Sequence, residues 1–476
     1  MTVTATDPVG PGATALVAGV DSSTQSCKVL VVDAESGSVV RSGSASHPDG
    51  TEVDPAYWWD ALGQASARAD LSGVVALSVA AQQHGMVALD AADEVVRPAL
   101  LWNDVRSAPQ ARAMVDRMGA QAWADAVGSV PLPAFTVTKL AWLAENEPAH
   151  ADAVTSVLLP HDWLTWRLLD RAGRPTTDRS DASGTGYWSP ATNGYRTDLL
   201  EQALGHAAEL PRVLGPREVA GTTREGVILG PGAGDNAGAA LGLGLQPGEV
   251  AVSLGTSGAL FAATDQRTND GSGIVAGFAD ATGRQLPLCC TLNAARVLTA
   301  TAAMLGTDLA GLDLLAAQAD PDAGGLTLLP YLDGERTPDL PTSAGSLHGL
   351  RRANMTPENL ARAAVLGLLC GLADALDAMC ANGIRADQVV LIGGASKSAA
   401  VRTAAPDIFG VPAVVPVEAE YVALGAARQA AWVLSGSTEP PVWKRDVLAE
   451  AVPSGSDWGP AVRERYSAIR HATYGI

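Results

Sequence analysis

The sequence predicts an α/β protein of two large domains, and three observations support this prediction. The chain has 476 residues, and single hydrophobic cores stop growing at roughly 250–300 residues. Segments typical of buried strands alternate with segments of helical periodicity, as in layered α/β domains. The pattern at residues 15–46, a buried strand that returns after a turn of small hydroxyl residues, recurs at residues 248–266. We interpret this repeat as a weak internal duplication, with a chance likeness between two hairpins as the alternative.

The first half of the chain opens with a strand and a hairpin. Residues 15–21 (ALVAGVD) have the pattern of a buried strand. Residues 28–46 predict a hairpin, because the polar turn DAESGS separates two runs rich in β-branched residues. A helical pattern follows at residues 58–70, and a further buried strand is expected at residues 74–82.

The second half repeats the hairpin and then changes to long helices. Residues 360–383 carry apolar side chains at helical spacing and end at Gly383, a typical residue just beyond a helix C-terminus. Residues 389–398 (VVLIGGASKS) predict a buried strand, two glycines and a new helix start. The chain after Ser435 loses this regularity and closes with an expected helix at residues 458–472.

These patterns divide the chain into four parts. We expect a flexible N-terminal tail at residues 1–14, a first domain at 15–247, a second domain at 248–435, and a C-terminal extension at 436–476 that packs on the domains.

Composition excludes several classes of partner. The net charge is -19, and no Lys/Arg patch is visible, so neither nucleic acid nor an acidic membrane surface is expected as a partner. The five cysteines form no CxxC pair, which is typical of a reduced protein with structural thiols. Residues 1–14 lack the features of a signal peptide, and no uninterrupted apolar run reaches the ~20 residues that cross a bilayer. We therefore expect a cytoplasmic protein.

Three turns of small residues follow buried strands and point to phosphate binding. They lie at residues 21–26 (DSSTQS), 255–258 (GTSG) and 393–398 (GGASKS). Backbone N–H groups at such turns and at helix N-termini bind phosphate well. No turn has the P-loop pattern or a dinucleotide GxGxxG pattern. The three together favour a nucleotide held in a cleft between two domains.

The stretch GPGAGDNAGAALGLGL at residues 230–245 carries a single charge, Asp235. One interpretation is that Asp235 caps a helix starting at Asn236, a common use of aspartate. The other is that a loop of such small residues lets a substrate approach the backbone and meet one base. The stretch alone leaves both interpretations open.

The chain resembles the FGGY carbohydrate kinases from about Leu16 to Arg428. Nine stretches in order carry the resemblance: GVDSSTQSCK, AAQQHGMVALD, PALLWNDVRS, FTVTKLAWLAEN, GAGDNAGAALGLG, VSLGTSGALF, LPYLDGERTP, GSLHGL and LIGGASKS. The resemblance implies two ribonuclease-H-like domains, as in actin-like ATPases and sugar kinases, with the active site in the cleft between them. It implies ATP-dependent phosphorylation of D-xylulose to D-xylulose 5-phosphate in pentose catabolism, with ATP and Mg²⁺ as cofactors. It leaves the oligomeric state open, with a homodimer as one expectation.

The resemblance also implies roles for individual residues. Asp235 matches the catalytic base that takes the proton of the sugar hydroxyl, and Asp21 matches the carboxylate that holds Mg²⁺. The implied sugar contacts are Gln83, His84, Trp102, Asp104, Asp235 and Asn236. The implied ATP contacts are Thr24, Lys28, Gly255, Thr256, Asn293, Gly394 and Ser398.

Structural alternatives accompany several of these roles. His84 could be a core histidine bonded to backbone, and Asp104 could simply pair with Arg106. Glu335 and Arg336 are expected to form an interdomain ion pair.

The sequence departs from the family pattern near the sugar site, and two alternative functions remain. Ala134 stands where relatives carry another residue, which leaves the identity of the sugar open. A kinase for another ketose or polyol (ribulose, a pentitol or glycerol) is the alternative within the class. A non-catalytic actin-like ATPase is the alternative outside it.

Overall fold

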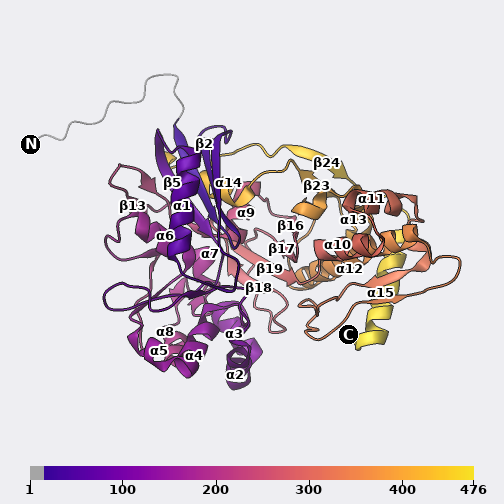
Figure 1. Cartoon of the computed structure of the whole chain (residues 1–476), viewed down its shortest axis with the longest axis horizontal. Coiled ribbons are helices and arrows are strands. Elements are labelled where there is room, and N and C mark those ends of the chain that lie inside the picture. Colours follow the sequence, from indigo (N-terminus) through magenta and orange to yellow (C-terminus); the bar gives the residue numbers. More distant parts are fainter. Residues whose placement is uncertain (1–14) are drawn as a thin grey trace, which may run out of the picture.

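The structure, a computed structural model, describes residues 15–476, and the predicted tail at residues 1–14 lies outside the described residues. The chain builds a first lobe around one twisted sheet and then a second lobe around another (Figure 1).

The first sheet contains seven strands in the order β13-β14-β5-β1-β2-β3, with β15 also pairing with β5. Strand β1, the first in the chain, pairs antiparallel with β2 and parallel with β5. The predicted strand at 15–21 and the predicted hairpin are therefore confirmed. The strands are β1 (Leu16–Ser22), β2 (Ser26–Asp33), β3 (Val39–Ser46), β5 (Val74–Ala81), β13 (Gly221–Thr222), β14 (Ile228–Leu229) and β15 (Ala233–Gly234).

The second sheet repeats this arrangement in the order β18-β19-β17-β16-β22-β23-β24. Its first strand, β16, again pairs antiparallel with the next strand and parallel with a later one, β22. The shared topology confirms the internal duplication that the sequence predicted. The strands are β16 (Glu249–Leu254), β17 (Gly258–Phe261), β18 (Ala276–Ala279), β19 (Gln285–Thr291), β22 (Gln388–Ile392), β23 (Ala413–Pro416) and β24 (Val447–Ala451).

Two helices cross between the sheets, α9 (Asp235–Leu243) and α14 (Tyr421–Ser435). Their backbones touch, because a Cβ atom on Gly425 would overlap the carbonyl oxygen of Gly238. This contact explains much of the small-residue composition of the stretch around Asp235. Helix α14 belongs to the second half of the sequence, yet its alanines pack on Val17 and Ala76 of the first sheet.

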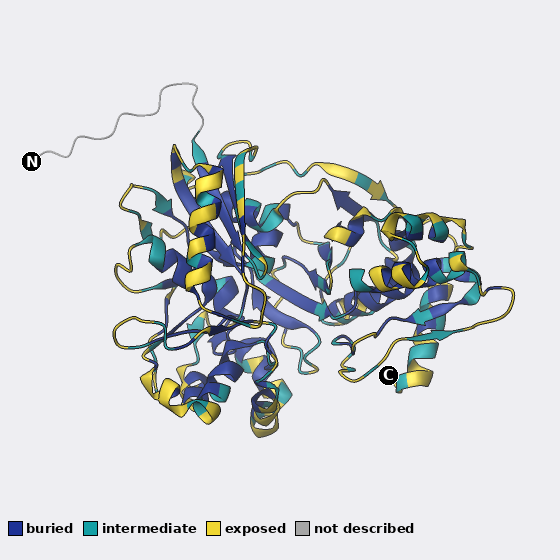
Figure 2. Cartoon of the chain, viewed as in Figure 1, coloured by how far each residue is buried: buried dark blue, intermediate teal, exposed yellow. Residues whose placement is uncertain are grey.

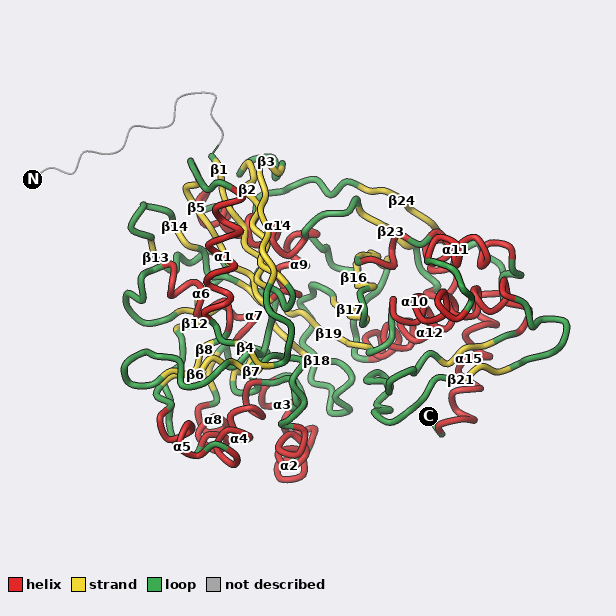
Figure 3. The backbone as a smooth tube through the Cα atoms, in the orientation of Figure 1, coloured by secondary structure: helices red, strands yellow, loops and turns green. Residues whose placement is uncertain are grey.

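Further helices pack on the two sheets or on the helices that cover them (Figure 3). Helix α1 lies on the first sheet, where Figure 2 shows its buried and exposed faces, and α12 runs through the core of the second lobe. Helix α12 ends at Ala381. Gly383 follows two residues later with φ +84°, so the predicted helix stop at this glycine is confirmed. These helices are α1 (Ala56–Ala69), α6 (Pro160–Leu168), α10 (Ala295–Met304), α11 (Leu309–Gln318), α12 (Pro357–Ala381), α13 (Ala399–Phe409) and α15 (Trp458–Tyr474).

Helix α12 is long and apolar enough to cross a membrane, but 72% of its apolar window is buried inside the protein. Helices α10 and α11 would pass the same test together, yet they meet at a bend of 85°. The composition of α12 is that of a core helix, because its side chains fill the centre of the second lobe.

The region between β5 and β13 adds short elements below the first sheet, and these supply one wall of the candidate site. They are β6 (Val87–Leu89), β7 (Ala99–Leu100), α2 (Ala108–Met118), α3 (Ala120–Val127), α4 (Thr136–Asn146), α5 (Pro148–Ala153), β8 (Ser156–Leu158), β9 (Thr176–Asp178), α7 (Arg179–Ala182), β10 (Trp188–Ser189), β11 (Gly194–Tyr195), α8 (Thr197–Leu204) and β12 (Arg212–Leu214). Strand β4 (Glu52–Val53), which precedes α1 in the chain, pairs with β7. The second lobe has two comparable short strands, β20 (Thr327–Leu329) and β21 (Ser346–His348).

The C-terminal extension belongs structurally to the second lobe. Strand β24 joins the edge of its sheet beside β23, and helix α15 packs on α12 and α13. The four-part division of the chain stays a prediction, and the position of α14 shows that contacts cross the boundary proposed near residue 248.

Candidate active site

Asp21 and Asp235 lie at the same edge of the first sheet, on either side of β5. Asp21 of β1 is in register with Ala80, and Gly234 of β15 is in register with Ala81. Because both flanking strands run parallel to β5, their carboxyl ends coincide, with backbones two strand spacings or about 10 Å apart. The fold thus brings together two carboxylates that are more than 200 residues apart in the sequence.

Asp235 is the first residue of α9 and not its cap. Gly234 precedes the helix, and the Asp235 carboxylate accepts hydrogen bonds from Asn236, at 2.8 Å from its backbone N and 2.9 Å from its Nδ2. Burial, with a further contribution from the charge of Asp21, raises the pKa of Asp235 from 3.8 to about 7. A general base works best when its pKa is near the working pH, and Asp235 has that property.

Asp21 is 5% exposed, and burial raises its pKa to about 6. A hydrogen bond from the Ser23 hydroxyl and the charge of Lys28 oppose that shift, while Glu420 adds to it. The Lys28 ammonium pairs with the Glu420 carboxylate at 2.5 Å, which links β2 to the start of α14. Two neighbouring carboxylates that are both hard to ionise form a place where a cation is stabilised.

A cavity of about 180 Å³ opens next to Asp235, between the two lobes. This is smaller than the roughly 300–1,000 Å³ typical of drug-sized ligands, so the cavity suits a small molecule. Five of the predicted sugar contacts line it, and Asp104 does not. The lining residues are Gln83, His84, Trp102, Ala134, Asp235 and Asn236 from the first lobe, with Ser257, Gly258, Ala259, Phe278, Leu288, Cys290 and Arg336 from the second.

His84 lines this cavity as a neutral imidazole. Burial, helped by the charges of Lys139 and Arg336, lowers its pKa to about 3. Its Nδ1 is 2.6 Å from the carbonyl oxygen of Gly184, and its ring stacks on Phe135 at 4.9 Å. Because a neutral ring can donate to that carbonyl only through a protonated Nδ1, Nε2 is the acceptor. His84 is thus both bonded to backbone, as the structural alternative required, and available to a ligand hydroxyl.

Gln83 and Asn236 form a connected pair of amides. Asn236 Nδ2 lies 3.4 Å from Gln83 Oε1, and Gln83 Nε2 lies 3.3 Å from the carbonyl oxygen of Ser180. A Cβ atom on Gly234 would lie 2.6 Å from the Gln83 side chain, so glycine is needed where the strand meets the helix. These contacts hold the residues on both sides of the Asp235 carboxylate.

Trp102 joins the cavity to the first predicted phosphate turn. Its indole Nε1 donates to the Thr24 hydroxyl at 2.7 Å, and the Trp102 side chain stays 39% exposed. A sugar against Trp102 would therefore lie next to the turn at residues 21–26.

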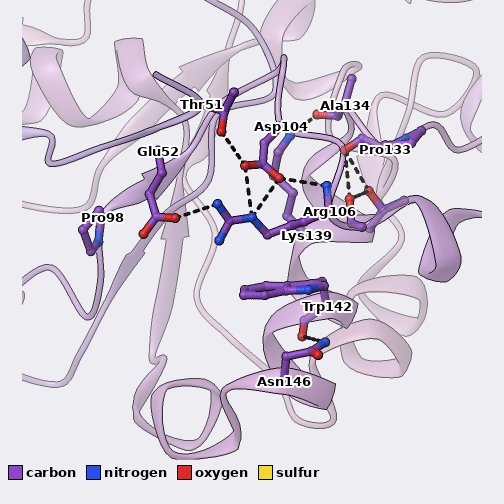
Figure 4. Close-up of polar contacts among 12 residues, drawn as sticks. Thr51, Glu52, Pro98, Asp104, Arg106, Pro133, Ala134, Lys139, Trp142 and Asn146 are labelled. Carbon is purple, nitrogen blue, oxygen red and sulfur yellow. Dashed lines mark hydrogen bonds and ion pairs between the residues drawn. The ribbon is translucent and has the colours of Figure 1, made fainter. Parts of the chain in front are cut away.

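Asp104 points into a different network, which Figure 4 shows. Its carboxylate accepts from Arg106 Nε at 2.9 and 3.0 Å and from the Thr51 hydroxyl at 2.8 Å. Arg106 continues to Glu52 at 2.7 Å and lies over the ring of Trp142. The pairing with Arg106 is the alternative that the sequence left open, and the sugar contact assigned to Asp104 has no geometric support here.

The predicted ATP contacts separate into two groups. Gly255 and Thr256 form the turn after β16, and the Gly255 carbonyl accepts from Ala295 N at 2.9 Å, at the start of α10. Gly394 and Lys28 line a second cavity of about 560 Å³ beyond that turn. Sequence reasoning missed Ser396 and Lys397, which line the same cavity, although they belong to the quoted glycine turn.

Ser398 and Asn293 have structural partners instead. The Ser398 hydroxyl caps α13, accepting from Val401 N at 3.1 Å and donating to Asp313, and it does not line the cavity. Asn293 is 3% exposed, and its Nδ2 donates to Gly334 O at 2.7 Å and to Glu335 at 3.0 Å. The ATP contacts assigned to these two residues therefore have no direct geometric support.

The expected interdomain ion pair of Glu335 with Arg336 is wrong. Glu335 accepts from Leu292 N at 2.5 Å and from Asn293, both within the second lobe. Arg336 instead lines the cavity beside Asp235. Adjacent residues with opposite charges suggested a pair, but their side chains point to different places.

Comparison with known proteins agrees with this site. The N-terminal and C-terminal domain models of the FGGY family of carbohydrate kinases match residues 16–242 and 250–434. The chain belongs to this family. It is therefore an ATP-dependent carbohydrate kinase with two lobes of the actin-like ATPase fold.

Relatives cover this FGGY kinase almost from end to end. It is 49% identical to the xylulose kinase of Streptomyces coelicolor over 446 residues, 90% of each chain. The crystal structure of xylulose kinase from Bifidobacterium adolescentis superposes with a TM-score of 0.89 at 46% identity, covering 96% of this chain and 99% of that one. Glycerol kinase from Plasmodium falciparum with ADP gives a TM-score of 0.85 over 97% of this chain and 98% of that one, and at 17% identity it shows the fold alone.

Beneath the Asp235 loop, the kinase carries a buried ionic network that sequence reasoning missed. His161 Nδ1 lies 2.6 Å from Asp181, and its Nε2 lies 3.3 Å from Asp162. Burial opposes the charge of His161, but these two carboxylates outweigh it and raise its pKa to about 9. A Cβ atom on Gly232 would overlap the His161 ring, so the network supports the loop directly. The signal in the sequence was a high density of polar residues within two otherwise apolar stretches, those around His161 and Asp181.

Proposed function

We propose that this FGGY kinase transfers the γ-phosphoryl group of ATP to D-xylulose and forms D-xylulose 5-phosphate. The observation that carries the proposal is Asp235, a carboxylate whose pKa is raised to about 7, in the wall of a small interdomain cavity. The S. coelicolor relative, named xylulose kinase, and a second one from Streptomyces rubiginosus, at 48% identity, support the choice of sugar.

The proposed reaction needs one base and fixed positions for both substrates. Asp235 takes the proton of the C5 hydroxyl while that oxygen forms a bond to the γ-phosphorus. The bond from that phosphorus to the bridging oxygen breaks, and ADP leaves with the electron pair. A positioned base contributes about 10²–10⁴ in rate. His84 Nε2 and the Gln83–Asn236 pair would hold other sugar hydroxyls.

Asp21 is the residue that would hold Mg²⁺. Carboxylate oxygens are the ligands that Mg²⁺ prefers, and Asp21 and Asp235 lie at the same edge of the first sheet, on either side of β5. When bound, the ion would neutralise charge on the ATP phosphates. The residues present therefore fit the cofactor.

ATP would lie across the turns of both lobes. Thr24 and Lys28 of the first lobe and Gly255 and Thr256 of the second would face its phosphates. The cavity of about 560 Å³ lined by Gly394 would take the adenosine part.

The test is a panel of ketoses and polyols, each with ATP and Mg²⁺, followed by coupled detection of ADP. D-Xylulose should give the highest kcat/KM, with ribulose, pentitols and glycerol below it. Glycerol above every ketopentose would refute the choice of sugar, and ADP release independent of any sugar would favour an ATPase. Cytoplasmic location and a homodimer stay predictions, for cell fractionation and sedimentation to test.

A further inference from the structure

Arg336 brings a second charge into the sugar cavity. Asp235 and Arg336 are the two residues with a formal charge among those that line it, because His84 is neutral. Asp235 comes from the first lobe, and Arg336 comes from the second. A small cavity meant for an uncharged sugar has no need of a cation.

The Arg336 guanidinium has no partner within residues 15–476. Its backbone N donates to Glu335 Oε1 at 2.7 Å, while no hydrogen bond, ion pair or ring contact of its side chain occurs in that range. By contrast, the half-buried Arg445 pairs with Glu249. An unpaired guanidinium next to a cavity is a ready partner for an anion, which it can bind through two parallel N–H groups.

The backbone on both sides of Arg336 is anchored. Glu335, 3% exposed, accepts from Leu292 N and Asn293, and Thr337, 4% exposed, donates to the Cys290 carbonyl at 2.7 Å. These contacts tie the residue to the end of β19. Such anchoring suits a residue that must present its side chain at one place.

We propose that Arg336 is a catalytic residue that binds the phosphoryl group while it passes from ATP to the sugar. This inference rests on the proposed function. The phosphoryl group leaves ADP and bonds to the hydroxyl oxygen, and its three non-bridging oxygens carry the charge throughout. The guanidinium donates N–H bonds to those oxygens, keeps its own protons and changes no covalent bond.

The geometry favours the phosphoryl group over the sugar as the partner of Arg336. Ser257 and Gly258, the last two residues of the second phosphate turn at 255–258, line the same cavity, so a phosphoryl group held by that turn lies at the cavity wall. A hydroxyl would leave the positive charge uncompensated, whereas a phosphoryl oxygen gives a charge-assisted bond.

The experiment compares Arg336→Ala and Arg336→Lys with wild type in steady-state assays using D-xylulose, ATP and Mg²⁺. Removal of a transition-state donor costs about 10²–10³ in kcat. We expect kcat of Arg336→Ala to fall at least about 100-fold, with less than about a threefold change in KM for the sugar. The kcat of Arg336→Lys should fall less, since lysine keeps the positive charge but lacks the two parallel N–H groups of the guanidinium. Added guanidinium ion should restore part of the Arg336→Ala activity and not raise that of wild type.

Arg385→Ala is the matched control, because Arg385 lies in the same lobe, is exposed and pairs with Asp387. It should keep wild-type kcat. Melting curves are measured alongside the assays. If the Tm of Arg336→Ala is below that of wild type, the kcat of Arg336→Lys is used to test the role of Arg336.

Three outcomes would overturn the inference. A rise in sugar KM with unchanged kcat would make Arg336 a sugar-binding residue. Unchanged kcat and KM would leave it without a role in the reaction. A wild type that prefers a sugar acid, with that preference lost in Arg336→Ala, would assign it to a carboxylate. If the panel shows another neutral sugar as best substrate, the choice of xylulose fails, and the same kinetic comparison with that sugar still decides the role of Arg336.

Discussion

Replacement of Asp235 by asparagine separates the base from every structural role of this residue. Asparagine keeps the size of the side chain. Its amide oxygen can still accept from Asn236 N, which in wild type lies 2.8 Å from Asp235 Oδ1. It cannot take a proton from a sugar hydroxyl. We therefore expect kcat to fall by about 10²–10⁴, the range that loss of a general base costs.

The same substitution should raise the free energy of unfolding, and the pH dependence of wild-type stability gives the size of this gain. The folded state raises the pKa of Asp235 from 3.8 to about 7, so the native carboxyl binds protons more tightly than the unfolded one. Wild type therefore loses stability as pH rises from about 4 to 7, by at most ~4 kcal/mol, which solvent in the cavity reduces to ~1–2 kcal/mol. Asp235→Asn lacks this loss.

The assay combines steady-state kinetics with urea unfolding at pH 4.5 and pH 8, and an ADP titration. Asp235→Asn should match wild type in stability at the lower pH, exceed it at the higher pH, and bind ADP. Asp116→Asn, an exposed replacement on α2, should change neither activity nor stability. An Asp235→Asn enzyme that binds ADP and phosphorylates D-xylulose at the wild-type rate would refute the assignment of the base.

Three further outcomes follow from the same contacts. In wild type, kcat/KM should fall about tenfold per pH unit below a pKa near 7, because protonation removes the base; a profile flat down to pH 5 would contradict this. His161→Asn should lose about 3–5 kcal/mol in urea unfolding, since two buried carboxylates lose their cation; a loss under 1 kcal/mol would show that the network is not ionic. Gly425→Ala should lower Tm, at a cost of about 1–3 kcal/mol, because its Cβ meets the backbone of α9. Its control, Gly63→Ala on α1, has open space at the Cβ position and should gain about 0.5–1 kcal/mol; equal effects of the two would contradict the close helix contact.

Local patterns in the sequence were enough to predict the opening strands of both sheets, because each sheet opens with a strand and hairpin of recognisable composition. They also located Asp21 and Asp235, since small-residue turns after buried strands mark where such sites form. The resemblance to a family then supplied the roles of these residues. What local patterns could not give was the direction of long side chains.

Asp104 and Arg336 illustrate that limit. Asp104 sits in a stretch typical of the sugar site, but its partners Thr51 and Arg106 and the more distant Glu52 turn it elsewhere. Arg336 was expected to pair with its neighbour, but the Glu335 carboxylate accepts from Leu292 N instead, and Arg336 lines the cavity. Both outcomes depend on residues brought close by tertiary folding.

The position of α14 has a consequence for how the protein is made. The apolar face of the first sheet, including Val17 and Ala76, is covered by α14, which begins at Tyr421, 340 residues after β5 ends at Ala81. A ribosome adding about 5–20 residues per second needs roughly 15–70 s to reach it. Throughout that interval the nascent first lobe keeps an uncovered apolar surface, and a gene truncated after the first lobe would keep it permanently. Holding chaperones should therefore associate with the growing chain until synthesis is nearly complete.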